Sequence, residues 1–155
     1  MSTFNKFEEY KLFVEDTARF TDRRQNVTNV YVAVNTILLS AVALLLTEKT
    51  MTRWLLALAA FAVLAGGVAV CLFWRQLIDK YKKLVSLRMI ELRKMEEHPD
   101  MAGCHAMYHT EDRLYPPGKA VRAFSDLERQ LPTVFMVLYA SFALGIAIAL
   151  ATGAL

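Results

Sequence analysis

Three long apolar runs constrain this chain more than any other feature. Residues 27–46, 54–74 and 131–155 contain no Asp, Glu, Lys, Arg or His. A helix needs about 20 apolar residues to cross the roughly 30 Å hydrocarbon core of a bilayer. A buried helix of a soluble protein rarely stays apolar on all faces for this length. The sequence therefore predicts three transmembrane helices.

The composition points to the same class of protein. Hydrophobic residues make up 55% of the 155 residues, and the mean hydropathy is +0.31. This argues against a soluble enzyme, a disordered chain, a solenoid and a disulfide scaffold, and the only cysteines, Cys71 and Cys104, lie in dissimilar surroundings. Because a polar segment of mixed charge precedes the first run, we expect that run to be a retained span rather than a cleaved signal peptide.

The distribution of Lys and Arg predicts the orientation. Residues 1–26 carry five of these cations and residues 75–130 carry eleven, whereas the hairpin 47–53 carries two. Loops rich in Lys and Arg stay in the cytoplasm. Both basic segments lie on one side of a three-span protein, so we expect a cytoplasmic N-terminus, an external hairpin and an external C-terminus.

An amphipathic helix is predicted before the first span, in residues 1–26, and we expect it to continue into that span because nothing between them breaks a helix. Its polar face is rich in acids, whereas helices that lie on membranes are usually basic on that face. We therefore favour packing against other cytoplasmic helices. Its apolar positions recur at helical spacing: Phe7, Tyr10, Val14 and Ala18.

The second span is predicted to extend into the cytoplasm as a stalk over residues 75–98. The stalk has one apolar stripe, which either the N-terminal helix or copies of the same stalk must cover. This stripe comprises Ile78, Tyr81, Val85, Met89 and Leu92. Residues 99–130 are expected to form a cytoplasmic loop up to Gly118 and then a short helix over 119–130, with Pro132 in the first turn of the last span.

No catalytic motif is present in the cytoplasmic segments. The only group of metal-ligand residue types is His98, Cys104, His105 and His109, and its loop-like surroundings favour exposed side chains over a metal or enzymatic site. We therefore predict no enzymatic activity, no cofactor and no metal. The acids nearly balance the bases, so we expect no nucleic-acid partner, and the cations near the second span are predicted to attract anionic lipid headgroups.

Polar and small residues within the spans have two interpretations each. Asn29, Asn35 and Thr36 in the first span either form hydrogen bonds between helices or line a pore. Small residues recur every fourth position in the third span and more briefly in the second, which predicts close helix packing within or between subunits. These are Ser141, Gly145, Ala149 and Gly153, with Ala62 and Gly66.

Several positions together resemble the RipA-type family of octameric small membrane proteins of bacteria. They are Tyr10-Lys11-Leu12, Arg23-Arg24-Gln25, Asn29 and Asn35, then Trp74-Arg75, Tyr81 and Leu84, and finally Asp126-Leu127-Glu128, Leu131-Pro132 and Phe135. The resemblance implies an inner-membrane homo-octamer with a cytoplasmic helical layer and no known enzymatic activity.

The sequence thus predicts an all-α polytopic membrane protein with three transmembrane helices. The leading functional hypothesis is a non-catalytic homo-oligomeric assembly, in which a ring of spans carries a cytoplasmic helical layer. The alternative hypothesis is a channel whose lumen is lined by Asn29, Asn35 and Thr36.

Overall fold

The computed structural model describes residues 6–48, 52–101, 103–114 and 124–153. Within these ranges every regular element is a helix, which confirms the predicted fold class. The elements are α1 (Lys6–Thr47), α2 (Arg53–Glu96), the 3-10 turn η1 (Pro99–Met101), α3 (Met107–Leu114) and α4 (Phe124–Thr152).

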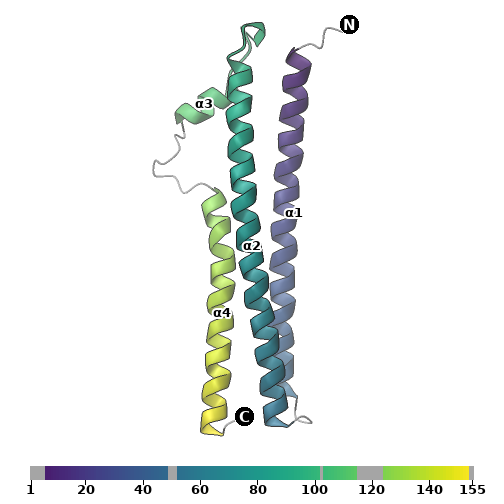
Figure 1. Cartoon of the computed structure of the whole chain (residues 1–155), viewed down its shortest axis with the longest axis vertical. Helices are drawn as coiled ribbons and strands as arrows, with labels where there is room; N and C mark the ends of the chain where they lie inside the picture. The colour runs from purple at the N-terminus through teal and green to yellow at the C-terminus, as the bar shows by residue number, and fades with distance from the viewer. Residues whose placement is uncertain (1–5, 49–51, 102, 115–123, 154–155) are drawn as a thin grey trace.

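Two long helices form an antiparallel hairpin, and a third helix lies along half of it (Figure 1). Helix α2 lies between α1 and α4 and packs against both. The C-terminus lies at the same end as the α1–α2 turn, and the N-terminus lies at the opposite end. Helices α1, α2 and α4 are each long and apolar enough to cross a membrane, as predicted.

Both long helices extend well beyond a bilayer. Helix α2 has 44 residues, which is about 66 Å at 1.5 Å per residue, against a hydrocarbon core of about 30 Å. The expected continuity of the N-terminal helix with the first span is confirmed, because α1 is one helix of 42 residues. Its N-terminal half packs against the stalk, where the Phe20 and Tyr81 rings lie 5.1 Å apart. Arg88 of the stalk covers the Phe20 ring and pairs with Asp16.

From Ala57 to Ile78, the buried positions of α2 alternate at intervals of three and four residues. A spacing of 3.5 residues on average is the seam of a left-handed coiled coil, in which side chains interlock along two helices. The seam runs through Ala57, Ala60, Leu64, Gly67, Cys71, Trp74 and Ile78. In α1, Thr28, Asn35 and Val42 are buried at intervals of seven. One mode of packing therefore continues from the polar part of the bundle into the apolar part.

The segment before α4 differs from the expectation. Residues 99–118 were expected to be a loop, but η1 and α3 lie within them, so that prediction is wrong for residues 99–101 and 107–114. The helix expected over 119–130 is not a separate element: α4 begins at Phe124 and continues through Pro132 to Thr152, and residues 119–123 lie outside the described ranges. A proline is tolerated inside an apolar helix because neighbouring groups satisfy the freed backbone carbonyl.

Candidate functional site

A polar contact joins the three long helices at the centre of the bundle. Asn35 of α1 is fully buried, and its Nδ2 donates to the carbonyl oxygen of Tyr31 at 2.7 Å. Its Oδ1 accepts from the Tyr139 hydroxyl of α4 at 2.8 Å and from the Cys71 thiol of α2 at 3.1 Å. Because the amide has partners on all three helices, it sets their depth relative to one another.

A glycine makes room for this contact. Tyr139 is only 1% exposed, and its ring lies against Gly67 of α2. A Cβ atom at residue 67 would lie 2.3 Å from Tyr139 Cζ and 2.7 Å from the hydroxyl oxygen. Only glycine allows the ring to occupy this position, so Gly67 is required for the hydrogen bond between Tyr139 and Asn35.

Aromatic rings fill the bundle on the side of this contact that lies toward the N-terminal half of α1. The Trp74 side chain is fully buried. Its ring is stacked on Tyr31 at 5.6 Å and lies 6.2 Å from Phe135. One to two helical turns further on, Arg24 and Glu128 form an ion pair of 3.5 Å, and their side chains are 14% and 9% exposed. A charge pair at this depth requires both partners, because either charge alone would be buried without compensation.

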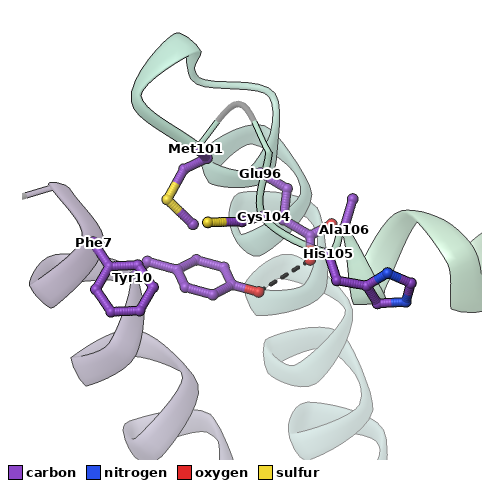
Figure 2. Close-up of a pocket in the computed structure, with 7 residues that line it drawn as sticks. All are labelled: Phe7, Tyr10, Glu96, Met101, Cys104, His105 and Ala106. Atoms are coloured by element: carbon purple, nitrogen blue, oxygen red, sulfur yellow. Dashed lines mark hydrogen bonds between the residues drawn. The ribbon is translucent and has the colours of Figure 1, made fainter.

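A second polar junction lies at the end of the bundle opposite the α1–α2 turn, where Glu96 joins α1, α2 and α3 (Figure 2). Its Oε1 accepts from the Tyr10 hydroxyl and from the Tyr108 backbone N–H, both at 3.0 Å. Its Oε2 accepts from the His109 backbone N–H at 3.1 Å and lies 2.9 Å from His109 Nδ1. Burial alone would raise the pKa of Glu96, but these hydrogen bonds outweigh it and hold the pKa below its usual value.

His109 holds α3 against the end of α2. Its second ring nitrogen, Nε2, lies 3.1 Å from Glu97 Oε1. The hydrogen bonds to Glu96 and then to Glu97 raise the pKa of His109, while burial and the Glu96 carboxylate raise that of Tyr10. The protonated imidazole is therefore the form that this junction favours.

A hollow of about 310 Å³ lies beside the junction. Its lining residues are Phe7, Tyr10, Glu96, Met101, Cys104, His105 and Ala106. Figure 2 shows that the His105 ring points away from Met101 and Cys104. Within the described part of the chain, no three His, Cys, Asp or Glu side chains are arranged to hold a metal ion. The polar groups here connect helices to one another.

The structure separates the polar residues that the sequence analysis grouped in the first span. Asn35 faces the interior, whereas Asn29 and Thr36 are exposed on α1. The hydroxyl of Thr36 donates to the carbonyl oxygen of Val32 in its own helix at 2.9 Å.

The small residues singled out in α2 and α4 mostly face outward in the single chain. Ala62, Gly66, Ser141, Gly145 and Gly153 are exposed, and Ala149 is half-buried. A Cβ atom added at Gly66 or Gly145 would meet nothing within 4 Å. The stalk positions are less exposed: Ile78 and Leu92 are buried, and Tyr81, Val85 and Met89 are half-buried.

Several residues of these contacts were not identified from the sequence. Gly67, Cys71 and Trp74 share one face of α2, but residues 54–74 are apolar on every face, so the sequence gives no signal that singles these three out. Tyr139 and Glu96 carry no such signal, because their partners lie 104 and 86 residues away in the chain.

A family model described as the Octameric membrane protein family (8xMP) matches residues 7–149. No curated protein and no solved structure matches the chain. The family match includes most of α1, all of α2 and α3 and nearly all of α4, so it covers both polar junctions and the three apolar helices. The chain is therefore a multi-pass membrane protein that belongs to the octameric membrane protein family.

Proposed function

We propose that the protein is a non-catalytic homo-octamer of the bacterial inner membrane, in which a ring of spans carries a cytoplasmic layer of helices. The layer consists of the N-terminal half of α1, the stalk of α2 and the short helix α3. The N-terminus is cytoplasmic and the C-terminus is external. The family match supports the subunit number, and the basic cytoplasmic segments support the orientation.

The observation that carries the proposal is apolar surface on the stalk that no lipid can reach. Leu84, Leu87 and Ile90 are 48%, 59% and 42% exposed in the single chain. They follow Trp74, the predicted inner boundary of the membrane, by 10 to 16 residues, which is about 15–24 Å along a helix. Headgroups extend only about 5–8 Å beyond the hydrocarbon core. We infer that protein covers these side chains, and the family match supports further copies of the chain as the source.

The mass of the intact complex tests this proposal. Native mass spectrometry of the protein released from detergent should give eight 17.6 kDa chains, about 141 kDa. A single chain as the only species, under conditions that leave the helical content intact, would exclude the assembly.

The native cysteines test the orientation. Cys104 is exposed and Cys71 is buried. A maleimide that cannot cross membranes should label inverted inner-membrane vesicles and should not label intact spheroplasts. The Cys104→Ser variant should remain unlabelled in both. Labelling of spheroplasts alone would reverse the proposed orientation. Vesicles with and without anionic lipid then test the predicted attraction of the cations near the second span to anionic headgroups; these cations are Arg75, Lys80, Lys82 and Lys83.

A conducting pore is the second candidate function, and the exposed polar side chains of α1 support it. Asn35 is an unsuitable lumen residue because its side chain is fully buried and forms its hydrogen bonds inside the bundle. A lumen would use Asn29 and Thr36 instead. Conductance across planar bilayers that falls in the Thr36→Leu variant would favour the pore, and no conductance over a wide range of voltages and ions would remove it.

A further inference from the structure

The exposed surface of α1 is divided into two sides along the membrane. One side carries large apolar residues that suit lipid: Val30, Val34, Ile37 and Leu44. The other side carries polar and small residues at intervals of seven. We call this second set the α1 track; it consists of Glu15, Asp22, Asn29, Thr36 and Ala43, and all five residues are exposed. A lipid-facing surface needs no such set, whereas small and polar residues let two helices approach closely and form hydrogen bonds.

The exposed surface of α2 carries a matching set, also at intervals of seven. We call it the α2 track; it consists of Ala62, Ala69, Gln76, Lys83 and Ile90, and all five residues are exposed. Its cytoplasmic end opens into a groove of about 620 Å³, lined in part by Lys83, Leu87 and Ile90. Beside Ala62 and Ala69, Gly66 leaves open space, since a Cβ atom there would meet nothing within 4 Å. The exposed surface of α2 therefore has only small side chains within the membrane and a groove at its cytoplasmic end.

Contacts within the chain give the relative heights of the two tracks. Tyr31 stacks on Trp74, Asn35 bonds to Cys71, and Asp16 pairs with Arg88. The two residues of each pair lie at the same height along the bundle, and we call them a level pair. The two residue numbers of each level pair add to about 105. In a ring about an axis normal to the membrane, all subunits stand at the same height, so the same rule holds between neighbouring copies.

At equal height, four of the five pairs between the tracks match in size, polarity or charge, and only Glu15 with Ile90 does not. The level pairs are Ala43 with Ala62, Thr36 with Ala69, Asn29 with Gln76, Asp22 with Lys83, and Glu15 with Ile90. Small residues face small residues inside the membrane, two amides meet near its inner edge, and a carboxylate meets an ammonium group in the cytoplasm. Among the described residues Asp22 has no ion-pair partner, and the exposed Lys83 would supply one.

We propose that the α1 track of each subunit packs against the α2 track of the next subunit. This inference rests on the proposed function, because it requires a homo-oligomer, and it names the surfaces that join the copies. The contact is heterologous, since two different surfaces meet. Such a contact forms a closed ring when the rotation from one subunit to the next divides a full turn into equal parts. It covers Leu87 and Ile90 with the cytoplasmic part of a neighbouring α1, and it leaves Val30, Ile37 and Leu44 to lipid.

Cysteine cross-linking tests the proposal in the full-length protein in membranes. The background is Cys104→Ser, with the buried Cys71 retained. On oxidation, Thr36→Cys combined with Ala69→Cys should give a ladder of bands up to eight chains on a denaturing gel. In each of two control variants, one cysteine of the pair stays in place and the other is moved to a position outside the proposed contact. Neither control should give a ladder. Ile37→Cys with Ala69→Cys changes the side of α1, and Thr36→Cys with Ala62→Cys changes the height by seven residues, about 10 Å.

The other outcomes overturn the inference in distinguishable ways. Dimers from Thr36→Cys alone would mean that two copies of α1 face each other. Rapid labelling of Thr36→Cys by a charged thiol reagent, without cross-links, would mean that this track lines a wet lumen. An intact octameric mass without the ladder refutes this interface alone, whereas a monomeric mass refutes the proposed function itself.

A charge exchange provides a second test that does not depend on cysteines. Asp22→Lys should lower the fraction of octamer in mild detergent, and addition of Lys83→Glu should restore it. Both residues are exposed in the single chain, so the subunit itself should keep its helical content. Loss without recovery in the double variant would contradict the pairing of Asp22 with Lys83.

Discussion

Two neighbouring glycines in α2 allow the central contact of the bundle to be tested with a matched control. Gly67→Ala would place a methyl group 2.3 Å from Tyr139 Cζ and 2.6 Å from Cε1. Overpacking of this kind costs about 1–3 kcal/mol, and displacement of the ring also removes a hydrogen bond worth about 0.6 kcal/mol in a membrane. The higher helix propensity of alanine returns about 1 kcal/mol. The expected net loss is therefore about 0.6–2.6 kcal/mol.

Gly66→Ala is the control, because it has the same gain in propensity and no neighbour within 4 Å of the added atom. It should leave the free energy of unfolding unchanged or raise it by up to about 1 kcal/mol. Unfolding in SDS can be followed by tryptophan fluorescence, since Trp74 is fully buried in the bundle. The packing argument is refuted if Gly67→Ala is as stable as the unmodified protein, or if both variants lose the same amount.

Three further perturbations address the other contacts. Asn35→Leu removes the acceptor of two buried donors and should cost about 1–3 kcal/mol in the same SDS titration, clearly more than Tyr139→Phe at about 0.6 kcal/mol. Arg24→Gln leaves the Glu128 carboxylate buried without its partner and should lower the free energy of unfolding by about 3–5 kcal/mol. The double variant Arg24→Gln with Glu128→Gln should regain part of this stability. Above about pH 6.5, hydrogen exchange of the α3 amides should accelerate beyond the intrinsic effect of pH, and this acceleration should be absent in His109→Gln.

The sign of the pH effect follows from the directions of the two pKa shifts. The raised pKa of His109 means that its contribution is complete below about pH 6.5 and is lost as the pH rises through the raised value. The lowered pKa of Glu96 means that its contribution is complete above about pH 4.5 and is lost as the pH falls through the lowered value. Helix α3 should therefore be held most firmly between these two pH values. Protection that is constant from pH 6 to pH 9 would contradict this account.

The outcomes for Asn35 and Tyr139 would also show whether the contact acts as a unit. If the cost of Asn35→Leu equals that of Tyr139→Phe, the Cys71 thiol and the amide contribute nothing beyond one hydrogen bond. If Glu128→Gln fails to improve the Arg24→Gln variant, the carboxylate has water near it in spite of its burial.

Some parts of this protein could be predicted from the sequence because they depend on local properties. A run such as 54–74 is apolar on all faces, so its length and lack of charge are enough to predict a span. The same holds for the continuity of α1 and α2, since no proline and few glycines interrupt them. The helix α3 was not predicted, because Glu96, eleven residues before its first residue, receives the N–H groups of its first turn.

The sequence by itself determined the class of fold, the three apolar helices and the extension of α2 beyond them. Only the tertiary structure decided which face of each helix points inward. Asn35 and Thr36 are adjacent and both polar, yet one is the centre of the bundle and the other lies on the exposed surface. The same holds for Gly66 and Gly67. Composition cannot distinguish such neighbours, because consecutive residues of a helix differ by about 100° and only the packed partner helices select the inward direction.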